Sequence, residues 1–361
     1  MSDDLCGGRS CSGDTPVCKG SGASSQCVAC LGNDDCSNAG TCNSSNACVC
    51  SARFNGTHCE FQVFRTVGTL QGDATSSVTC ISHDGSVIAG ISGSLPAHAF
   101  RSINGGTLEF IAEPTTLTPS VGCRPKAVDN SSAVLLDCEG KSFLHTTAGG
   151  TVAIDLPTSG YASDLSLDGK VLVGYVGSQG LRKVGSTNTL LGPLQPNSGT
   201  TFVATNADGT VAVGRDTSVG GVRWTAATGL VALEKLSGWN NYGPTDVSAD
   251  GKVIVGSVDP NTTALAVKWS GAKATTSVLW HGQANAVNGD GSVVVGTDSE
   301  VTAAWIFDNA GPRSLQQLIY DSGTQDLGAH QLQNAFGVSD DGKFVVGDGG
   351  PSGQGWIAHL P

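Results

Sequence analysis

A ten-residue pattern that recurs seven times limits the possible folds of this 361-residue chain more than any other feature. Its clearest copy, residues 247–256, reads Val-Ser-Ala-Asp-Gly-Lys-Val-Ile-Val-Gly. Asp-Gly between β-branched runs is typical of a β-hairpin, because glycine supplies the positive φ that a tight turn needs. Each copy therefore predicts one hairpin. The other copies are 81–90, 165–174, 205–214, 287–296 and 338–347, with a degraded copy at 128–136.

The residues around each Asp-Gly pair have distinct expected roles. A Ser or Asn two positions before the aspartate is expected to cap the turn backbone. The glycine that closes each copy is expected to end the second strand. The capping residues are Ser82, Ser166, Asn206, Ser248, Asn288 and Ser339, and the closing glycines are Gly90, Gly174, Gly214, Gly256, Gly296 and Gly347.

Each unit continues for two further strands. An aromatic residue follows most Asp-Gly pairs after 15 to 19 residues, and a Gly-containing turn then leads to another apolar run. The units start 38 to 51 residues apart, counted from Asp84 and its equivalents, with Asn130 as the equivalent in the degraded copy. Four strands at this period indicate a β-propeller blade, so the sequence predicts an all-β fold with seven blades. The aromatic residues are Phe100, Trp224, Trp269, Trp305 and Trp356, with Phe143 and Val184 at this place in the weaker copies.

The two ends of the repeat region indicate how the ring closes. The last unit stops after 356–360, one strand short, and an unassigned strand at 64–70 precedes the first unit. Pairing of 64–70 with the last blade would remove two open sheet edges. We therefore expect a closed seven-bladed propeller at 61–361, preceded by a Cys-rich module at 1–60.

The repeat unit resembles the extracellular HAF repeat of bacterial surface and secreted proteins. Residues 98–101, His-Ala-Phe-Arg, and 66–70, Thr-Val-Gly-Thr-Leu, match that pattern closely. The resemblance covers about 64–361. It implies a secreted or cell-surface location, and it implies no defined activity.

Ten of the thirteen cysteines lie between Cys6 and Cys59. So short a segment cannot bury enough apolar core by itself, so its cysteines are expected to form disulfides in an oxidising compartment. Zinc is the alternative for the Cys27-x-x-Cys30 motif, but His58 is the one histidine nearby. Residues 15–30 also resemble the Cys-rich leaders of secreted proteins from myxobacteria.

The last six cysteines of this segment resemble an EGF-like module. Residues 48–59 match the family's Cys-x-Cys ending, except that Arg53 stands where glycine is usual. The resemblance implies the pairs Cys30–Cys42, Cys36–Cys48 and Cys50–Cys59. The acidic signature of calcium-binding EGF modules is not evident. The pairing of Cys6, Cys11, Cys18 and Cys27 is left open.

Three cysteines remain in the propeller region. Cys123 and Cys138 flank the degraded hairpin, and we expect them to be bonded to each other. Cys80 would then be buried and free, and a Cys80–Cys123 bond is the alternative.

Charge and hydropathy restrict the partners and the location. The net charge of −12 argues against nucleic acid and anionic membranes. No apolar run approaches membrane-spanning length, and the acidic N-terminus lacks a signal-peptide core. Because the cysteines need an oxidising compartment, we expect that a signal peptide was removed and that Met1 is not native.

Variable loops on a rigid scaffold are the usual place for function. In each blade the loops joining strands 2 and 3, and strand 4 to the next blade, share one face, called here the loop face. The Asp-Gly turns lie on the opposite turn face. The loop 236–243 carries aromatic and amide groups outside the repeat pattern, which suit sugars or peptides. The candidate ligand-binding residues are Trp239, Asn240, Asn241 and Tyr242, with Trp280 and His281 in a comparable loop. The alternative is that Trp239 and Tyr242 only pack the loop onto its blade.

Calcium is compatible with the repeated aspartates. However, the oxygens of pairs such as Asp208 and Asp216 are split by an apolar strand, so turn chemistry is favoured over a calcium site. No catalytic motif is present, and the Asp-Gly turns match the sialidase Asp-box only faintly. We expect no catalytic residues and no metal site.

The sequence favours a secreted binding or adhesion protein that recognises a glycan or a protein through its loop face. One alternative is a structural subunit of an extracellular assembly, including self-assembly. The other is a propeller hydrolase or lyase with a central-channel site, which a convergent carboxylate–histidine pair at the axis would favour.

Overall fold

The computed structural model describes most of residues 61–360, together with short pieces of 5–55. Within 61–360 the exceptions are 95, 115–121, 237–240, 260–263, 272–274, 323–326, 328–329 and 351–352. The chain divides into two compact units, which are described separately. One contains 1–65, 317–328 and 358–361, and the other contains 66–316 and 329–357.

The first unit includes the Cys-rich segment, whose described strands are short and paired antiparallel. Disulfides join Cys30 to Cys42 and Cys36 to Cys48, with Cα–Cα distances of 5.8 and 5.7 Å. These two predicted pairs are confirmed. The predicted Cys50–Cys59 pair lies outside the described residues. The strand pairs are β1 (Leu5–Cys6) with β2 (Arg9–Ser10), β3 (Val17–Lys19) with β4 (Gln26–Val28), β5 (Thr41–Cys42) with β6 (Cys48–Val49), and β7 (Phe54–Asn55) with β8 (Phe61–Gln62).

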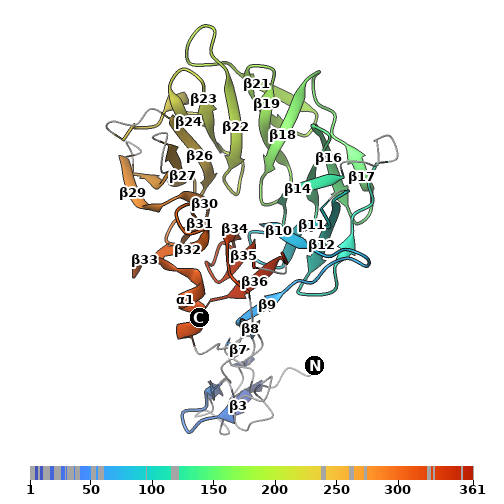
Figure 1. The fold of residues 1–361 in the computed structure, drawn as a ribbon, viewed down its shortest axis with the longest axis vertical. Coiled ribbons are helices and arrows are strands. Elements are labelled where there is room, and N and C mark those ends of the chain that lie inside the picture. The colour runs from blue at the N-terminus through green and yellow to red at the C-terminus, as the bar shows by residue number, and fades with distance from the viewer. Residues whose placement is uncertain are drawn as a thin grey trace. The chain divides into compact units, whose positions relative to one another are not determined.

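Seven four-stranded antiparallel sheets stand around one axis and form the blades of a propeller (Figure 1). In the first six blades the strands follow one another in chain order from the axis outward. Blade 1 is β10 (Ser76–Ile81), β11 (Val87–Ser92), β12 (His98–Ile103) and β13 (Glu109–Phe110). Blade 2 is β14 (Cys123–Val128), β15 (Val134–Cys138), β16 (Lys141–Thr146) and β17 (Gly150–Ala153). Blade 3 is β18 (Gly160–Leu165), β19 (Val171–Val176), β20 (Gln179–Val184) and β21 (Thr187–Leu191).

The later blades repeat this arrangement, with one helix added. Blade 4 is β22 (Thr200–Thr205), β23 (Val211–Asp216), β24 (Gly220–Thr225) and β25 (Gly229–Ala232). Blade 5 is β26 (Asn241–Val247), β27 (Val253–Asp259), β28 (Leu265–Ser270) and β29 (Thr275–His281). Blade 6 is β30 (Gln283–Val287), β31 (Val294–Asp298), β32 (Ala303–Asp308) and β33 (Gly311–Ser314). The segment between blades 6 and 7 contains the helix α1 (Leu315–Asp321).

Blade 7 closes the ring. Its sheet order is β34 (Asn334–Val338), β35 (Phe344–Asp348), β36 (Trp356–His359) and then β9 (Phe64–Thr66) from the start of the repeat region. The Val67 N–H donates to the Gly355 carbonyl at 2.9 Å, and the His359 N–H donates to the Val63 carbonyl at 2.9 Å. The predicted closure by the strand that precedes the first unit is confirmed.

The Asp-Gly turns form the hydrogen bonds that the sequence predicts. In blade 1 the Ser82 hydroxyl donates to Asp84 at 2.7 Å and accepts the Val87 N–H at 2.9 Å. The other predicted caps accept the equivalent N–H. In the degraded copy the carboxylate of Asp129 caps the turn, and Asn130 occupies the place of His83. The use of Asn130 as the equivalent of Asp84 is therefore wrong, because this turn is one residue shorter.

The closing glycines lie inside the second strands, so the prediction that they end these strands is wrong. Each first strand has a β-bulge, as between Val78 and Cys80, that shifts its register against the second strand. The bulge brings a first-strand carbonyl against the glycine. A Cβ on Gly90 would overlap the carbonyl oxygen of Ser77 and would lie 2.9 Å from the ring of Phe100.

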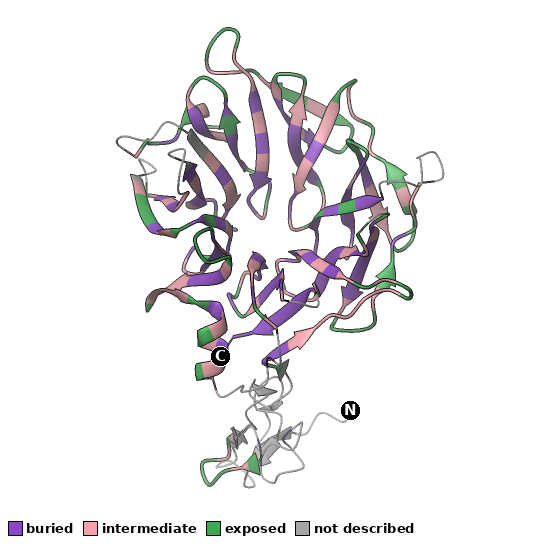
Figure 2. Ribbon diagram, in the orientation of Figure 1, coloured by how far each residue is buried: buried purple, intermediate pink, exposed green. Residues whose placement is uncertain are grey.

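The aromatic residues occupy two registers. Phe100 pairs with Gly90 and Trp305 pairs with Gly296, whereas Trp224 pairs with Ala212, two residues further along the blade. The predicted spacing of 15 to 19 residues therefore includes two registers, and Phe100, Trp269, Trp305 and Trp356 are all fully buried. Figure 2 shows buried residues on the inner strands and exposed residues toward the outer strands and turns.

The cysteines of the propeller behave as expected. Cys123 and Cys138 face each other across β14 and β15 and are bonded, with a Cα–Cα distance of 4.3 Å. Cys80 is buried and free, so the alternative Cys80–Cys123 bond is wrong. Burial raises the pKa of the Cys80 thiol to about 12. Among the described residues, no helix is both long and apolar enough to cross a bilayer.

Candidate functional site

Blade 5 brings the two parts of the predicted ligand-binding set to one end. Tyr242 pairs with Val258, Val258 pairs with Leu265, and Leu265 pairs with His281. Asn241 and Tyr242 therefore start the first strand of this blade, and Trp280 and His281 end its last strand. All four lie on strands rather than in the loops where the sequence placed them. Trp239 and Asn240 lie outside the described residues.

Trp280 and His281 are held by the neighbouring blade. The Trp280 indole N–H donates to the Asp298 carboxylate at 2.9 Å, and the indole is partly buried. The His281 ring stacks beside Trp280 at 5.8 Å between centroids, and its Nδ1 lies 3.5 Å from the Glu300 carboxylate. His281 is half-exposed, with 56% of its side chain accessible. Of this pair, His281 is the side chain available to a ligand.

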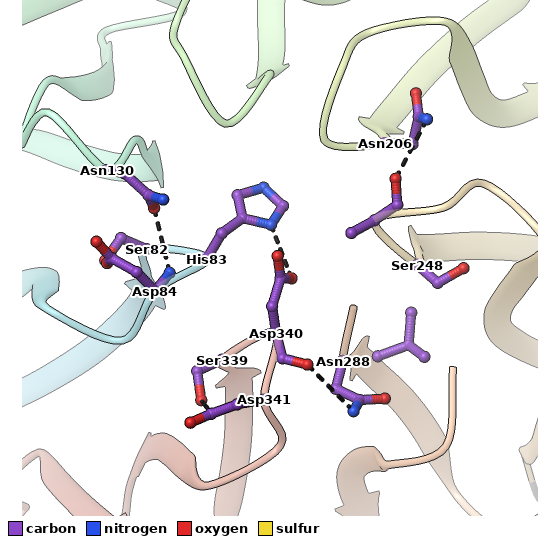
Figure 3. A network of polar contacts seen from close by, with 12 residues as sticks. Ser82, His83, Asp84, Asn130, Asn206, Ser248, Asn288, Ser339, Asp340 and Asp341 are labelled. Carbon is purple, nitrogen blue, oxygen red and sulfur yellow. Dashed lines mark hydrogen bonds and ion pairs between the residues drawn. The ribbon is translucent and has the colours of Figure 1, made fainter. Parts of the chain in front are cut away.

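A second candidate lies on the propeller axis, at the turn-face end of the channel. Hydrogen bonds run from blade to blade around this end and close a full circle. Figure 3 shows part of this network, including the contacts of Asn130 with Asp84, His83 with Asp340 and Asn288 with Asp340. The Leu167 N–H donates to Ala207, the Ala207 N–H to Ala249, and the Asp340 N–H to His83, all to carbonyl oxygens. The remaining contacts are Asp84 N–H to the Asn130 side chain, Asn130 N–H to Leu167, Asp250 N–H to Gly289 and Gly289 N–H to Asp340.

A histidine–carboxylate pair stands within this circle. The His83 ring nitrogen Nδ1 lies 2.9 Å from the Asp340 carboxylate. Burial opposes protonation of His83, but its hydrogen bond to Asp340 and the charge of that carboxylate outweigh burial and raise the pKa of His83. Both side chains are partly exposed to the channel.

Two further carboxyl groups line the channel. The Asp164 carboxylate accepts the Thr205 N–H at 2.8 Å, and the Asp246 carboxylate accepts the Val287 N–H at 2.8 Å. Burial raises the pKa of Asp164 to about 6. Burial also raises the pKa of Asp246 to about 7, and the charge of Asp164 contributes to this rise.

These groups limit what the channel can do chemically. Its cavity of about 180 Å³ holds a few water molecules or a small ion, and it is smaller than typical sites for organic ligands, which measure about 300–1,000 Å³. Groups with pKa values near neutrality can exchange protons with that water. However, Asp164 and Asp246 each join their blade to the next, and His83 is bonded to Asp340. The axis therefore carries the carboxylate–histidine pair that would favour a propeller enzyme, and these groups also join neighbouring blades.

The sequence analysis did not identify Asp164 and Asp246. They occupy the same place in their repeats as Cys80, Ala127, Ala204, Ala286 and Gly337. An acidic residue at a position otherwise filled by small residues was a signal that could have found them.

No channel group forms a metal cluster among the described residues. Three cysteine sulfurs, of Cys30, Cys36 and Cys48, lie close enough to share an ion, but all three are engaged in disulfides. The repeated aspartates use their oxygens within the protein. Asp208 accepts from Thr210 and Asn206, and Asp216 accepts from Ser218 and Thr200.

Comparisons with known proteins show the fold. No protein-family model matches the chain, and no curated protein matches it. The β-propeller domain of Cps50 (Swd1) from Myceliophteria thermophila has a TM-score of 0.54 at 14% identity, covering 82% of this chain and 100% of that domain. An oligogalacturonate lyase in complex with manganese has a TM-score of 0.52 at 13% identity, covering 82% and 96%. A streptogramin B lyase has a TM-score of 0.53 at 12% identity, covering 82% and 97%. These neighbours differ in function, so the likeness extends to the propeller alone.

Proposed function

We propose that this chain is a secreted or cell-surface binding protein that recognises a glycan or another protein at the loop-face end of blade 5. The observation that carries the proposal is the register of this blade, which places 241–242 and 280–281 in one row across four strands. Neighbouring strands lie about 4.8 Å apart, so the row spans about 14 Å, which fits two or three sugar rings or a short peptide.

An extracellular location is supported by the disulfides. Cys30–Cys42 and Cys36–Cys48 match the first two pairs of an EGF-like module, and Cys123–Cys138 holds the blade whose turn lacks Asp-Gly. Such bonds form and persist in oxidising compartments. The likeness of the repeat to the HAF pattern of bacterial surface proteins supports the same location. A structural role in an extracellular assembly is the alternative proposal.

The test is a glycan and polysaccharide array probed with the natural chain and with a Trp239→Ala/Tyr242→Ala double variant. Binding to a defined group of glycans, lost or weakened about tenfold in the variant, is the expected result. His281→Ala is expected to weaken binding less, since one half-exposed ring is removed.

The matched control is Phe110→Ala, which removes an aromatic ring that is 53% exposed on the outer strand of blade 1. This variant should bind like the natural chain, and all variants should melt at the same temperature. Binding of neutral glycans that ignores the double substitution would overturn the assignment to blade 5. No binding to any glycan would direct the search to protein partners.

A further inference from the structure

The turn face carries a groove across blades 3, 4 and 5, on the side of the ring opposite to the loop face. Two hollows of about 540 and 640 Å³ form it, and they are contiguous because both are lined by Arg223 and Asp250. Each lies within the range of about 300–1,000 Å³ typical of ligand sites. The name turn-face groove is used here for these two hollows, whose lining includes Arg182, Arg223, Trp224, Thr228, Asp250 and Lys252.

Arg182 is fixed in place by the next blade. Its Nε donates to the Gly209 carbonyl at 2.8 Å, and its guanidinium carbon lies 5.5 Å from the centroid of the Trp224 indole. A guanidinium has five N–H donors, and stacking on an aromatic ring holds its plane. Within the described part of the chain, the other four donors of Arg182 make no hydrogen bond.

Arg223 makes the equivalent hydrogen bond one blade further on. Its Nη2 donates to the Gly251 carbonyl at 3.4 Å, and it lines the same hollow as Trp269. Burial lowers the pKa of Arg223, which shows that part of its hydration is already lost. An arginine at this place stays charged at neutral pH.

Neither guanidinium has a carboxylate partner among the described residues. Elsewhere in the propeller, Arg101 pairs with Glu109 and Arg313 pairs with Asp308. One acidic residue, Asp250, lines the described part of the groove, and its carboxylate lies 2.8 Å from the Lys252 ammonium. The groove therefore keeps two uncompensated positive charges on a chain whose net charge is −12.

The same geometry occurs at a third boundary. The Lys268 ammonium lies 3.4 Å from the Gly291 carbonyl and 5.8 Å from the centroid of the Phe307 ring. Arg182, Arg223 and Lys268 thus occupy equivalent places on three successive blades. Regularly spaced cations suit a polymer that carries regularly spaced anionic groups.

We propose that the turn-face groove binds a segment of an anionic polysaccharide, with Arg182 and Arg223 holding its carboxylate or sulfate groups. Planar guanidiniums bind such groups with two parallel hydrogen bonds, and a half-buried indole beside them offers an apolar surface to sugar rings. Nucleic acid also carries anionic groups, and poly(dT) separates the two kinds of polymer in the test.

Binding of polygalacturonate, dextran sulfate, neutral dextran and poly(dT) to the full chain tests this proposal by biolayer interferometry. Polygalacturonate or dextran sulfate should bind, neutral dextran should not, and the affinity should fall as salt rises. Which of the two anionic polymers binds identifies the group as carboxylate or sulfate. An Arg182→Gln/Arg223→Gln variant should lose about tenfold or more in affinity, since each guanidinium supplies charge-assisted hydrogen bonds.

The matched control is Lys141→Gln/Lys343→Gln, which removes the same charge from two exposed lysines outside the groove. It should bind like the natural chain. If the arginine variant does not fold, Ala227→Glu adds a carboxylate to the groove at an exposed turn and should weaken binding similarly. No binding of either anionic polymer, binding unchanged by the groove variants, or poly(dT) bound equally through the same arginines would each overturn the proposal. The Trp239→Ala/Tyr242→Ala variant should bind the anionic polymer normally, which separates this site from the loop face.

Discussion

Asp246 is an acidic side chain at a place where three other blades carry alanine. Its carboxylate accepts N–H groups from Val287 and Val247, but burial raises its pKa to about 7. An unfolded aspartate has a pKa of about 3.9. Between about pH 3.9 and pH 7, Asp246 is therefore protonated in the folded chain and ionised in the unfolded chain. Its contribution to stability is therefore fully present below pH 4 and is lost as the pH rises toward 7.

We predict that Asp246→Ala reduces the loss of stability between pH 4.5 and pH 8. Between these two pH values, the free energy of unfolding of the natural chain is expected to fall by about 1–3 kcal/mol more than that of the variant. The variant should still lose some stability as the pH rises, because it retains Asp164 and His83, whose pKa values are also raised in the folded chain. Urea unfolding at the two pH values measures the effect. Asp155→Ala, at an exposed aspartate outside the channel, is the control, and an equal slope in both variants would contradict the prediction.

At this scale, local chemistry could be predicted and long-range chemistry could not. The role of Ser82 follows from contacts within five residues, which a short pattern contains. The environment of Asp246 depends on Val287, which lies 41 positions away on the next blade. The side-chain orientation of Trp280 likewise depends on Asp298 of another blade. Sequence reasoning found Trp280 by its departure from the repeat, but it placed this residue in a loop instead of a strand.

The recurrent element is a bulged first strand against a second strand that carries glycine. The hairpins themselves were predictable, because Asp-Gly and alternating valines are local signals. The bulge was not predictable, since no residue type marks it. Its seven positions include Thr79, Lys126 and Phe336, which share no chemistry. The closing glycine was therefore interpreted as the end of a strand. It instead marks the place where a carbonyl of the first strand lies closest to the second strand.

We predict that Gly90→Ala lowers the free energy of unfolding by about 2–4 kcal/mol, because the new methyl group meets both the Ser77 carbonyl and the Phe100 ring. Gly192→Ala is the matched control, since the nearest atom to its new methyl lies 3.8 Å away. That variant should change stability by less than about 0.5 kcal/mol. Urea unfolding monitored by tryptophan fluorescence compares the two, and a similar effect in both would show that the bulge tolerates a side chain.

The whole ring depends on one seam, where β9 pairs with β36. Every other blade is built from consecutive strands, so its hairpins hold it together. The last blade is completed by a strand from the far end of the repeat region, as the count of strands in the sequence predicted. Hydrogen bonds of Val67 with Gly355 and of His359 with Val63 join the two segments.

We predict that Val67→Pro destabilises the protein by about 3 kcal/mol, because proline removes the N–H that bonds to Gly355. Val67→Ala keeps this N–H and is expected to cost about 1 kcal/mol. Hydrogen exchange followed by mass spectrometry should show faster exchange of β36 in the proline variant, with β18 to β25 unchanged. Equal protection of β36 in both variants would mean that the seam is held by side chains alone.

This seam also sets the order of events during synthesis. A ribosome delivers Phe64 before the six consecutive blades and Trp356 after them, so six blades can form while β9 still lacks its partner β36. Until β36 emerges, β9 has no strand to pair with, and the nascent chain presents an unsatisfied edge. A chain that is released early, by a stop codon or a protease, cannot close at all. Closure of the ring therefore requires that both β9 and β36 have been synthesised, and a chain that lacks either strand stays open.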